Sequence, residues 1–293
     1  SKYMKRKRLV TTVSLLGAAF LAGCGQIGAE TSSEATSGSA AEAVEVTTVK
    51  VAHTQSSAPM NYVDENGEST GYEVSVLKAI DELLPQYEFE YVPTSDEDLL
   101  IGIESGKYAV GTKGAWYTEE RAQKFIFPEH YIGASSIGVL IRSEDAAEIT
   151  DLETFAAAGK SLVPISPNNA QYNVIQAFNE EHPDTPIELT AADVFEIADA
   201  YTWLLEGRYD GYFAVKTAYE VNVLAEGAPY SQYKDDFSYF VYEALPTWPL
   251  FNKDQQALAD AYDEAFLQLQ EDGTIDDLMI EFLGENTFQY VKE

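Results

Sequence analysis

The sequence is poor in cysteine and in basic residues. Cys24 is the only cysteine, so no disulfide can form within the chain and its stability must come from packing. The 18 Lys and Arg against 49 Asp and Glu leave a formal net charge of −31 at pH 7. A surface this acidic repels phosphate backbones and anionic headgroups, which excludes nucleic acid as a partner.

Signatures of catalysis and of metal binding are also lacking. The sequence has no GxSxG, HExxH or P-loop motif, and its three histidines have no metal-type spacing. Acids are so numerous that a pair placed for acid–base chemistry is expected by chance. We therefore expect a protein that is not an enzyme and needs no metal or cofactor.

The N-terminal region has the pattern of a signal peptide. Basic residues at 5–8 precede about a dozen mostly apolar residues, Leu9 to Phe20, too few to span a bilayer of roughly 30 Å. The tetrapeptide Leu-Ala-Gly-Cys at 21–24 then resembles the bacterial lipoprotein signal, in which the cysteine is diacylated and the chain is cut before it. The alternative is a buried free thiol beside an ordinary secretion signal. We expect residues 1–23 to be the signal and Cys24 to anchor the protein to the outer face of the cell membrane, since two acyl chains hold a membrane stably.

Residues 24–46 are rich in Ser, Thr, Ala, Gly and Glu and have almost no large apolar side chain. Such a segment cannot bury enough surface to offset the entropy of ordering. The sequence predicts a flexible tether here, with folded structure beginning near Thr47.

The first half of the folded part alternates between strand and helix patterns. Strands are predicted at 47–53, 87–91 and 107–111, with a hairpin turn at 64–67. A helical stripe runs from 72 to 84, and Ser95 precedes three acids in the manner of a helix cap. This order predicts a parallel sheet with crossover helices.

The second half repeats this style. Residues 150–153 have the spacing of a capping box, 161–165 and 209–215 read as strands, and Ser166 and Pro167 are expected to open a helix. Further helices are predicted at 195–206, 254–270 and 275–283. The chain is therefore expected to form two α/β lobes.

Six segments, in this order, resemble the family 3 extracellular solute-binding proteins of ABC importers for polar amino acids. They are the opening turn and first helix (62–67 and 71–80), the segments at 99–108, 114–121 and 125–131, the Gly-Arg-Tyr-Asp-Gly at 207–211, and the closing helix region (271–274 and 282–284). The resemblance covers about residues 47–285. It implies the type II periplasmic-binding-protein fold, in which two lobes joined by two hinge crossings close around a ligand.

The resemblance also implies domain boundaries. The crossings would be 137–143 and 247–253. Lobe I would be 47–140 plus 248–293, and lobe II would be 141–247.

Arg121 is the residue that the resemblance marks most strongly. In the family's Thr-x-Glu-Arg pattern, matched by residues 118–121, the arginine holds the ligand's α-carboxylate. A planar guanidinium suits this task because it makes two parallel charge-assisted bonds. The alternative is an exposed arginine paired with Glu119 or Glu120.

Other ligand contacts follow from the same resemblance. Gly114, Ala115 and Trp116 lie in the loop that offers main-chain groups, and Thr54 completes this side of the site. For Trp116, an ordinary core position is as good an interpretation as a cleft wall. On the other lobe, Ser166, Asn168 and Asn169 lie at a helix start, whose free N–H groups suit a carboxylate.

Departures from the family pattern affect the ligand's ammonium. The position of the family's ammonium-binding acid is Val215 here, followed by Lys216, as in some cystine-binding members. Asp96 is the best remaining candidate for the ammonium, although it is also a normal residue for a first helical turn.

These features predict an extracytoplasmic, monomeric, lipid-anchored binding protein. It would capture an amino acid or similar carboxylate, cystine being one possibility, and deliver it to an ABC permease with its ATPase. Two alternatives are a dehydratase-type enzyme on the same fold and a ligand sensor.

Overall fold

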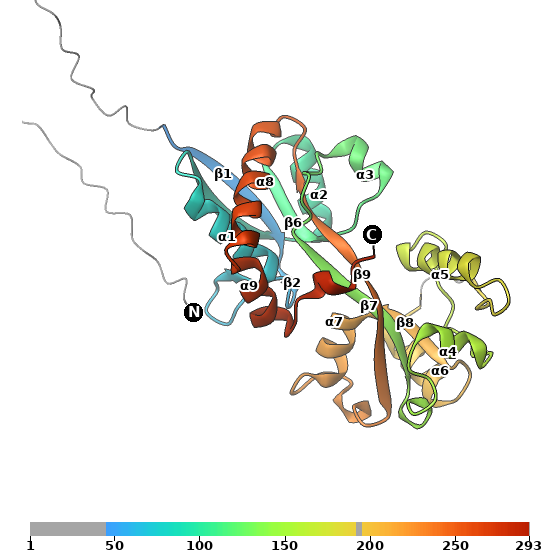
Figure 1. The fold of residues 1–293 in the computed structure, drawn as a ribbon. Coiled ribbons are helices and arrows are strands. Elements are labelled where there is room, and N and C mark those ends of the chain that lie inside the picture. Colours follow the sequence, from blue (N-terminus) through green and yellow to red (C-terminus); the bar gives the residue numbers. More distant parts are fainter. Residues whose placement is uncertain (1–44, 192–194, 293) are drawn as a thin grey trace, which may run out of the picture. The chain divides into compact units, whose positions relative to one another are not determined.

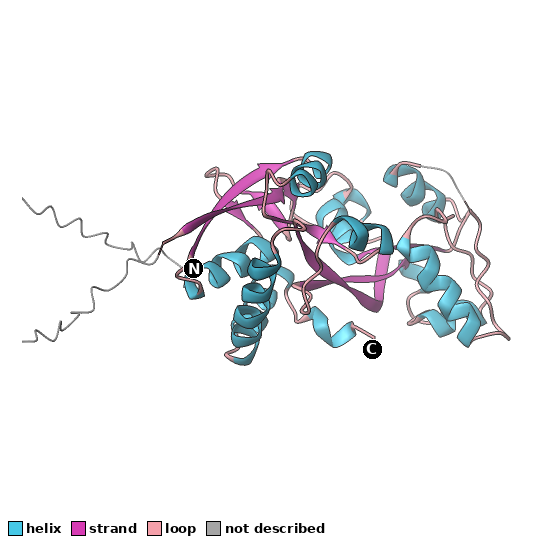
Figure 2. Ribbon diagram, turned by 90° about the horizontal axis from the view of Figure 1, so that it is seen from above, coloured by secondary structure: helices cyan, strands magenta, loops and turns pink. Residues whose placement is uncertain are grey.

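The computed structural model describes residues 45–191 and 195–292 (Figures 1 and 2). The predicted signal peptide, Cys24 and all but the last two residues of the predicted tether lie outside this part of the chain. Within it, no helix has the length and apolar character needed to cross a membrane.

The strands form two sheets. The larger has the order β5-β1-β6-β9-β7-β8 and the smaller the order β2-β3-β4. Their bounds are β1 Thr47–Thr54, β2 Ser56–Ser57, β3 Asn61–Val63, β4 Ser69–Thr70, β5 Tyr87–Thr94, β6 Val110–Ala115, β7 Gly133–Arg142, β8 Gly211–Val215 and β9 Phe237–Phe251.

The helices are distributed along the whole described chain. The α-helices are α1 Tyr72–Leu83, α2 Asp96–Ser105, α3 Glu119–Lys124, α4 Leu152–Ala157, α5 Ala170–Glu181, α6 Ile197–Leu205, α7 Lys216–Tyr219, α8 Gln256–Glu271 and α9 Thr274–Leu283. Short segments of other type are η1 Ser143–Asp145, η2 Glu220–Leu224 (a π-helix), η3 Ser231–Tyr233 and η4 Thr287–Tyr290.

The parallel sheet predicted for the first half is confirmed. β1 pairs in parallel with β5 along its whole length and with β6 on its other side. The Ser95 cap is also observed, since its side chain accepts a hydrogen bond from Asp98 N at 3.2 Å. The third strand begins later than expected, at Val110, because Gly106 ends α2 in a left-handed conformation and the chain first turns back.

Long paired strands connect two hydrophobic cores. β9 pairs with β7 through residues 237–247 and with β6 through residues 248–251, so it belongs to both halves of the sheet (Figure 1). Buried side chains of the first core come from residues 49–132 and 250–279. Those of the second core come from residues 137–237. The exact boundaries of lobe I and lobe II given above remain a prediction.

Three local expectations for the second half were wrong. Residues 161–165 form only isolated bridges, at Leu162 and Ile165, and no strand. The capping box lies one residue later than predicted, because the carboxylate of Asp151 accepts from Thr154 N at 2.7 Å and makes Asp151 the cap.

The third concerns the start of α5, which is not opened by Ser166 and Pro167. Ser166 O accepts a hydrogen bond from Asn169 N at 2.9 Å, which forms a turn. The Asn169 side chain then accepts from Gln171 N at 3.1 Å and caps the helix. Asn is as good an N-cap as Ser, and here the turn from Ser166 to Asn169 places Asn169 at the N-cap position of α5.

Candidate ligand-binding site

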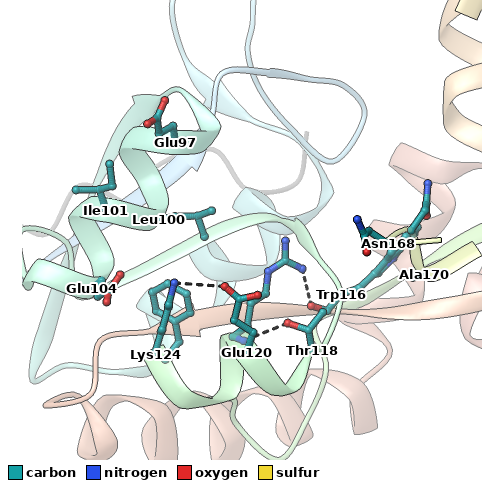
Figure 3. A pocket seen from close by; sticks show the side chains of 13 residues that line it. Glu97, Leu100, Ile101, Glu104, Trp116, Thr118, Glu120, Lys124, Asn168 and Ala170 are labelled. Carbon is teal, nitrogen blue, oxygen red and sulfur yellow. Dashed lines mark hydrogen bonds and ion pairs between the residues drawn. The ribbon is translucent and has the colours of Figure 1, made fainter. Parts of the chain in front are cut away.

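A cavity of about 570 Å³ lies between α2, α3, the loop that precedes α3, and the start of α5. In Figure 3, Glu97, Leu100, Ile101 and Glu104 lie on one side and Asn168 and Ala170 on the other, with Trp116, Thr118 and Glu120 between them. The remaining lining residues are Arg121, Lys124, Phe125 and Asn169. The lining therefore combines residues from both halves of the chain.

Arg121 is held in this cavity by local structure. The Thr118 side chain caps α3 by accepting from Arg121 N at 3.1 Å, and Arg121 Nη1 donates to Trp116 O at 2.9 Å. No ion pair among the described residues involves Arg121, so it is not paired with Glu119 or Glu120 as the alternative interpretation had it. A guanidinium has five N–H donors, and most of these are left for a ligand.

The loop before α3 brings Trp116 to the site, whereas its expected neighbours Gly114 and Ala115 lie at the end of β6 and are not among the lining residues. Gly114 has a φ of +66°, a conformation that favours glycine. Ala115 is buried. The Trp116 ring lines the cavity and also packs against the second core, and its Nε1 is buried with no partner among the described residues. Trp116 thus has both roles that the sequence left open.

The second side of the cavity contains Asn168 and Asn169, as expected. The Oδ1 of Asn169 is already used in capping α5, while Asn168 is exposed. Ser166 is not among the lining residues. Of the three residues expected at this helix start, the structure brings two to the site.

Three further expected site residues, Asp96, Lys216 and Thr54, also lie away from the cavity. Asp96 Oδ1 pairs with Lys113 Nζ at 2.9 Å, with the Asp96 side chain 61% exposed. Lys216 Nζ pairs with Glu285 Oε1 at 2.9 Å and lines a separate cavity beside Ser136. Thr54 is buried in β1 and does not line the cavity.

The Lys216–Glu285 pair extends to the C-terminal segment. Glu285 Oε2 accepts from Tyr290 Oη at 2.9 Å. Burial alone would lower the pKa of Lys216, but the bond and charge of Glu285 raise it above its usual value. Lys216 is therefore a charged member of an ion pair that lies away from the main cavity.

Sequence reasoning missed the contribution of α2. Glu97, Leu100, Ile101 and Glu104 follow the i, i+3, i+4, i+7 spacing of one helix face. Leu99 and Ile103 are fully buried on another face, whereas Ile101 is 57% exposed. Two apolar residues flanked by two acids on one helix face, with Leu100 half-buried and Ile101 exposed, were the available signal.

Comparison with known proteins agrees with this architecture. Residues 49–285 match the model of the bacterial extracellular solute-binding proteins, family 3. The chain is 29% identical over 227 residues to the L-cystine-binding protein TcyJ of Bacillus subtilis (strain 168), covering 76% of this chain and 79% of TcyJ. It is 27% identical over 240 residues to TcyK of the same strain, also an L-cystine-binding protein, covering 79% and 81%.

Solved structures show the same fold. The probable amino-acid ABC transporter extracellular-binding protein ytmK of Bacillus subtilis superposes with a TM-score of 0.66 at 23% identity, over 82% of this chain and 99% of that one. The unliganded, open L-cystine solute receptor of Neisseria gonorrhoeae gives a TM-score of 0.60 at 19% identity, over 84% and 95%. The fold is the two-lobed periplasmic-binding-protein fold. The family model spans most of the chain, and the protein therefore belongs to the bacterial extracellular solute-binding proteins of family 3.

Proposed function

We propose that this protein captures an amino acid or amino-acid-like carboxylate outside the cytoplasm and delivers it to the permease of an ABC importer. The observation that carries the proposal is Arg121, which lines the cavity and forms no ion pair among the described residues. L-cystine is the first candidate ligand, because two relatives that resemble most of the chain bind it.

In the proposed order of binding events, the ligand first contacts Arg121. Its guanidinium holds the ligand carboxylate, while Trp116 walls the site and Asn168 and Asn169 add contacts from the other side when the lobes close. The ligand favours the closed form to the extent that it binds that form more tightly. Asp96 and Lys216 have partners elsewhere. The acids that line the cavity, Glu97, Glu104 and Glu120, therefore replace them as candidates for the ligand's ammonium.

Thermal unfolding with a ligand panel tests this function. At about 100 times its dissociation constant, a specific ligand stabilises the folded state by about 2.7 kcal/mol, or about 5–10 °C for a domain of this size. We expect L-cystine to give such a shift and a neutral sugar to give none. No shift with any amino acid or small carboxylate would contradict the proposal.

We also propose that binding involves no chemical change, since the matched family consists of solute-binding proteins. Mass spectrometry of the ligand released after incubation should recover it unaltered. Release of a dehydrated or otherwise converted product would favour the enzyme instead.

The lipid anchor is a further part of the proposal. Cys24 follows the signal-like segment, and diacylation of its sulfur would hold the monomeric protein on the membrane. In a bacterial host, Cys24→Ala should move the protein from the membrane fraction to the soluble fraction and remove the mass of the acyl chains. A wild-type protein that is soluble and unacylated in such a host would contradict the anchor.

A further inference from the structure

A buried polar network lies behind the loop that precedes α3. Glu73, the second residue of α1, is fully buried, and one of its oxygens, Oε1, accepts from Asn61 Nδ2 at 2.7 Å and from Gly114 N at 2.8 Å. Thr112 Oγ1 donates to Asn61 Oδ1 at 2.8 Å. The network therefore joins β3, α1 and β6 away from solvent.

This arrangement is costly for the fold. Burial raises the pKa of Glu73, although the bonds from Asn61 and Gly114, the nearby Thr247 hydroxyl and the charge of Lys113 act in the opposite direction. The other carboxyl oxygen, Oε2, and the Thr247 Oγ1 on β9 interact, but neither makes a hydrogen bond of normal geometry among the described residues. An apolar side chain at this position would avoid the cost of burying an imperfectly paired carboxyl group.

The network is connected to the ligand site through the main chain. Gly114, whose amide Glu73 holds, has a φ of +66°. Two residues later, the carbonyl of Trp116 accepts from Arg121 Nη1 at 2.9 Å. The irregular backbone at Gly114, near the end of β6, thus directs the chain into the loop and helps to determine where that carbonyl lies, and the carbonyl orients the guanidinium.

We propose that Glu73 is a positioning residue for the ligand site: by holding the Gly114 amide it fixes the loop that orients Arg121 before a ligand arrives. The effect on affinity rests on the proposed function, but the effect on the loop does not. Preorganisation of this kind raises affinity because the ligand need not order the site.

The chemistry of the network predicts which substitutions preserve it. Both donors converge on a single oxygen, so Glu73→Gln keeps the acceptor and offers an amide to Thr247 Oγ1. Glu73→Ala leaves Asn61 Nδ2 and the Gly114 amide unpaired. Glu73→Asp keeps the carboxyl group but withdraws it by one methylene, and it serves as the disrupting variant if the alanine protein does not fold.

Asn252→Ala is the matched control. Asn252 is a second buried polar residue associated with the first core, and its Nδ2 donates to Ile103 O at 2.7 Å. Its loss also removes a buried hydrogen bond, but that bond is made to α2 and not to the end of β6, where Gly114 lies.

Amide hydrogen exchange without ligand tests the positioning directly. Relative to amides of β1, exchange across residues 114–116 should rise at least 10-fold in Glu73→Ala or Glu73→Asp. It should stay within about 3-fold of the wild type in Glu73→Gln and within 2-fold in Asn252→Ala. Equal increases in Glu73→Ala and Asn252→Ala, or no increase in either disrupting variant, would overturn the proposal.

Calorimetry with L-cystine, or with the ligand identified by thermal shift, provides the second readout. Glu73→Ala should weaken binding 10- to 100-fold, while Glu73→Gln and Asn252→Ala should change it less than 3-fold. If Glu73→Gln weakens binding as much as Glu73→Ala, the acceptor role is wrong. If the wild type binds no amino acid, the proposed function fails, and the exchange measurement still decides whether Glu73 holds the loop.

Discussion

Arg121→Ala is expected to weaken ligand binding about 30- to 1000-fold, which corresponds to about 2–4 kcal/mol. The loss is large because the ligand carboxylate would be left without its charged partner in a closed site. Arg121→Lys should lie between the wild type and alanine, since an ammonium keeps the charge but not the planar pair of donors. Isothermal titration calorimetry with L-cystine, or with the ligand identified by thermal shift, measures the effect.

Lys124→Ala is the control for this substitution. Lys124 lies on the same helix, lines the same cavity and carries the same charge, but its Nζ faces Glu120 Oε1 at 3.5 Å in an exposed pair. Such pairs contribute little, so binding should change less than about 3-fold. Equal losses in the two variants would show that only the overall charge of the cavity matters and would contradict the specific role of Arg121.

Arg142→Ala is expected to destabilise the fold by about 3 kcal/mol, the lower end of the range for a buried pair, because the Asp210 side chain keeps 24% of its surface exposed. The Arg142 side chain is 15% exposed, and its Nη2 lies 2.6 Å from Asp210 Oδ1. Its Nη1 donates to Leu204 O at 2.8 Å and to Tyr209 O at 2.7 Å. This one side chain connects the end of β7 to the end of α6 and the chain entering β8. Urea unfolding followed by circular dichroism measures the free energy.

Arg208→Ala provides the matched control. Arg208 is an exposed arginine in the turn after α6, with its guanidinium carbon 5.1 Å from the centre of the Trp203 ring. A cation–π contact at an exposed site contributes about 0.5–1 kcal/mol, so the loss should not exceed that. Comparable losses for Arg142 and Arg208 would contradict the structural role given to Arg142.

The effect of Arg142 should also depend on pH. Burial alone would raise the pKa of Asp210, but hydrogen bonds from Ser161 N and Arg142 lower it below its usual value. A carboxylate with a lowered pKa stabilises the fold above the unfolded pKa of about 3.9, and this contribution disappears as the pH falls through the folded value. The difference in stability between wild type and Arg142→Ala should therefore shrink below about pH 4. A difference that stays constant down to about pH 3 would contradict the pairing.

The sequence predicted best what depends on neighbouring residues. The strand at 47–53, the helix from 72 and the Ser95 cap depend on alternation, helical spacing and a side chain reaching three residues ahead, all visible locally. Errors arose where two local solutions compete. Ser166 and Asn169 can both cap a helix, and the turn between them decided for Asn169.

The site could be predicted where the family motif contains the residue. It could be predicted less well where the place of a side chain depends on a hydrogen-bond or ion-pair partner that is distant in the sequence. Arg121, Trp116 and the two asparagines lie on the cavity because the motif and the fold fix them. The partner of Lys216 is Glu285, 69 residues later, and nothing in the sequence near Lys216 indicates that bond. The burial of Glu73 could not be predicted either, because it depends on bonds from Asn61 in β3 and Gly114 in β6, which are distant from it in the sequence.

A crystal structure with the bound ligand tests the central claim most directly. We expect the Arg121 guanidinium to lie about 2.7–3.0 Å from the ligand's carboxylate oxygens, with Trp116 against the ligand. A ligand bound in another cavity, or an Arg121 side chain facing solvent while the ligand is held by other groups, would contradict the account.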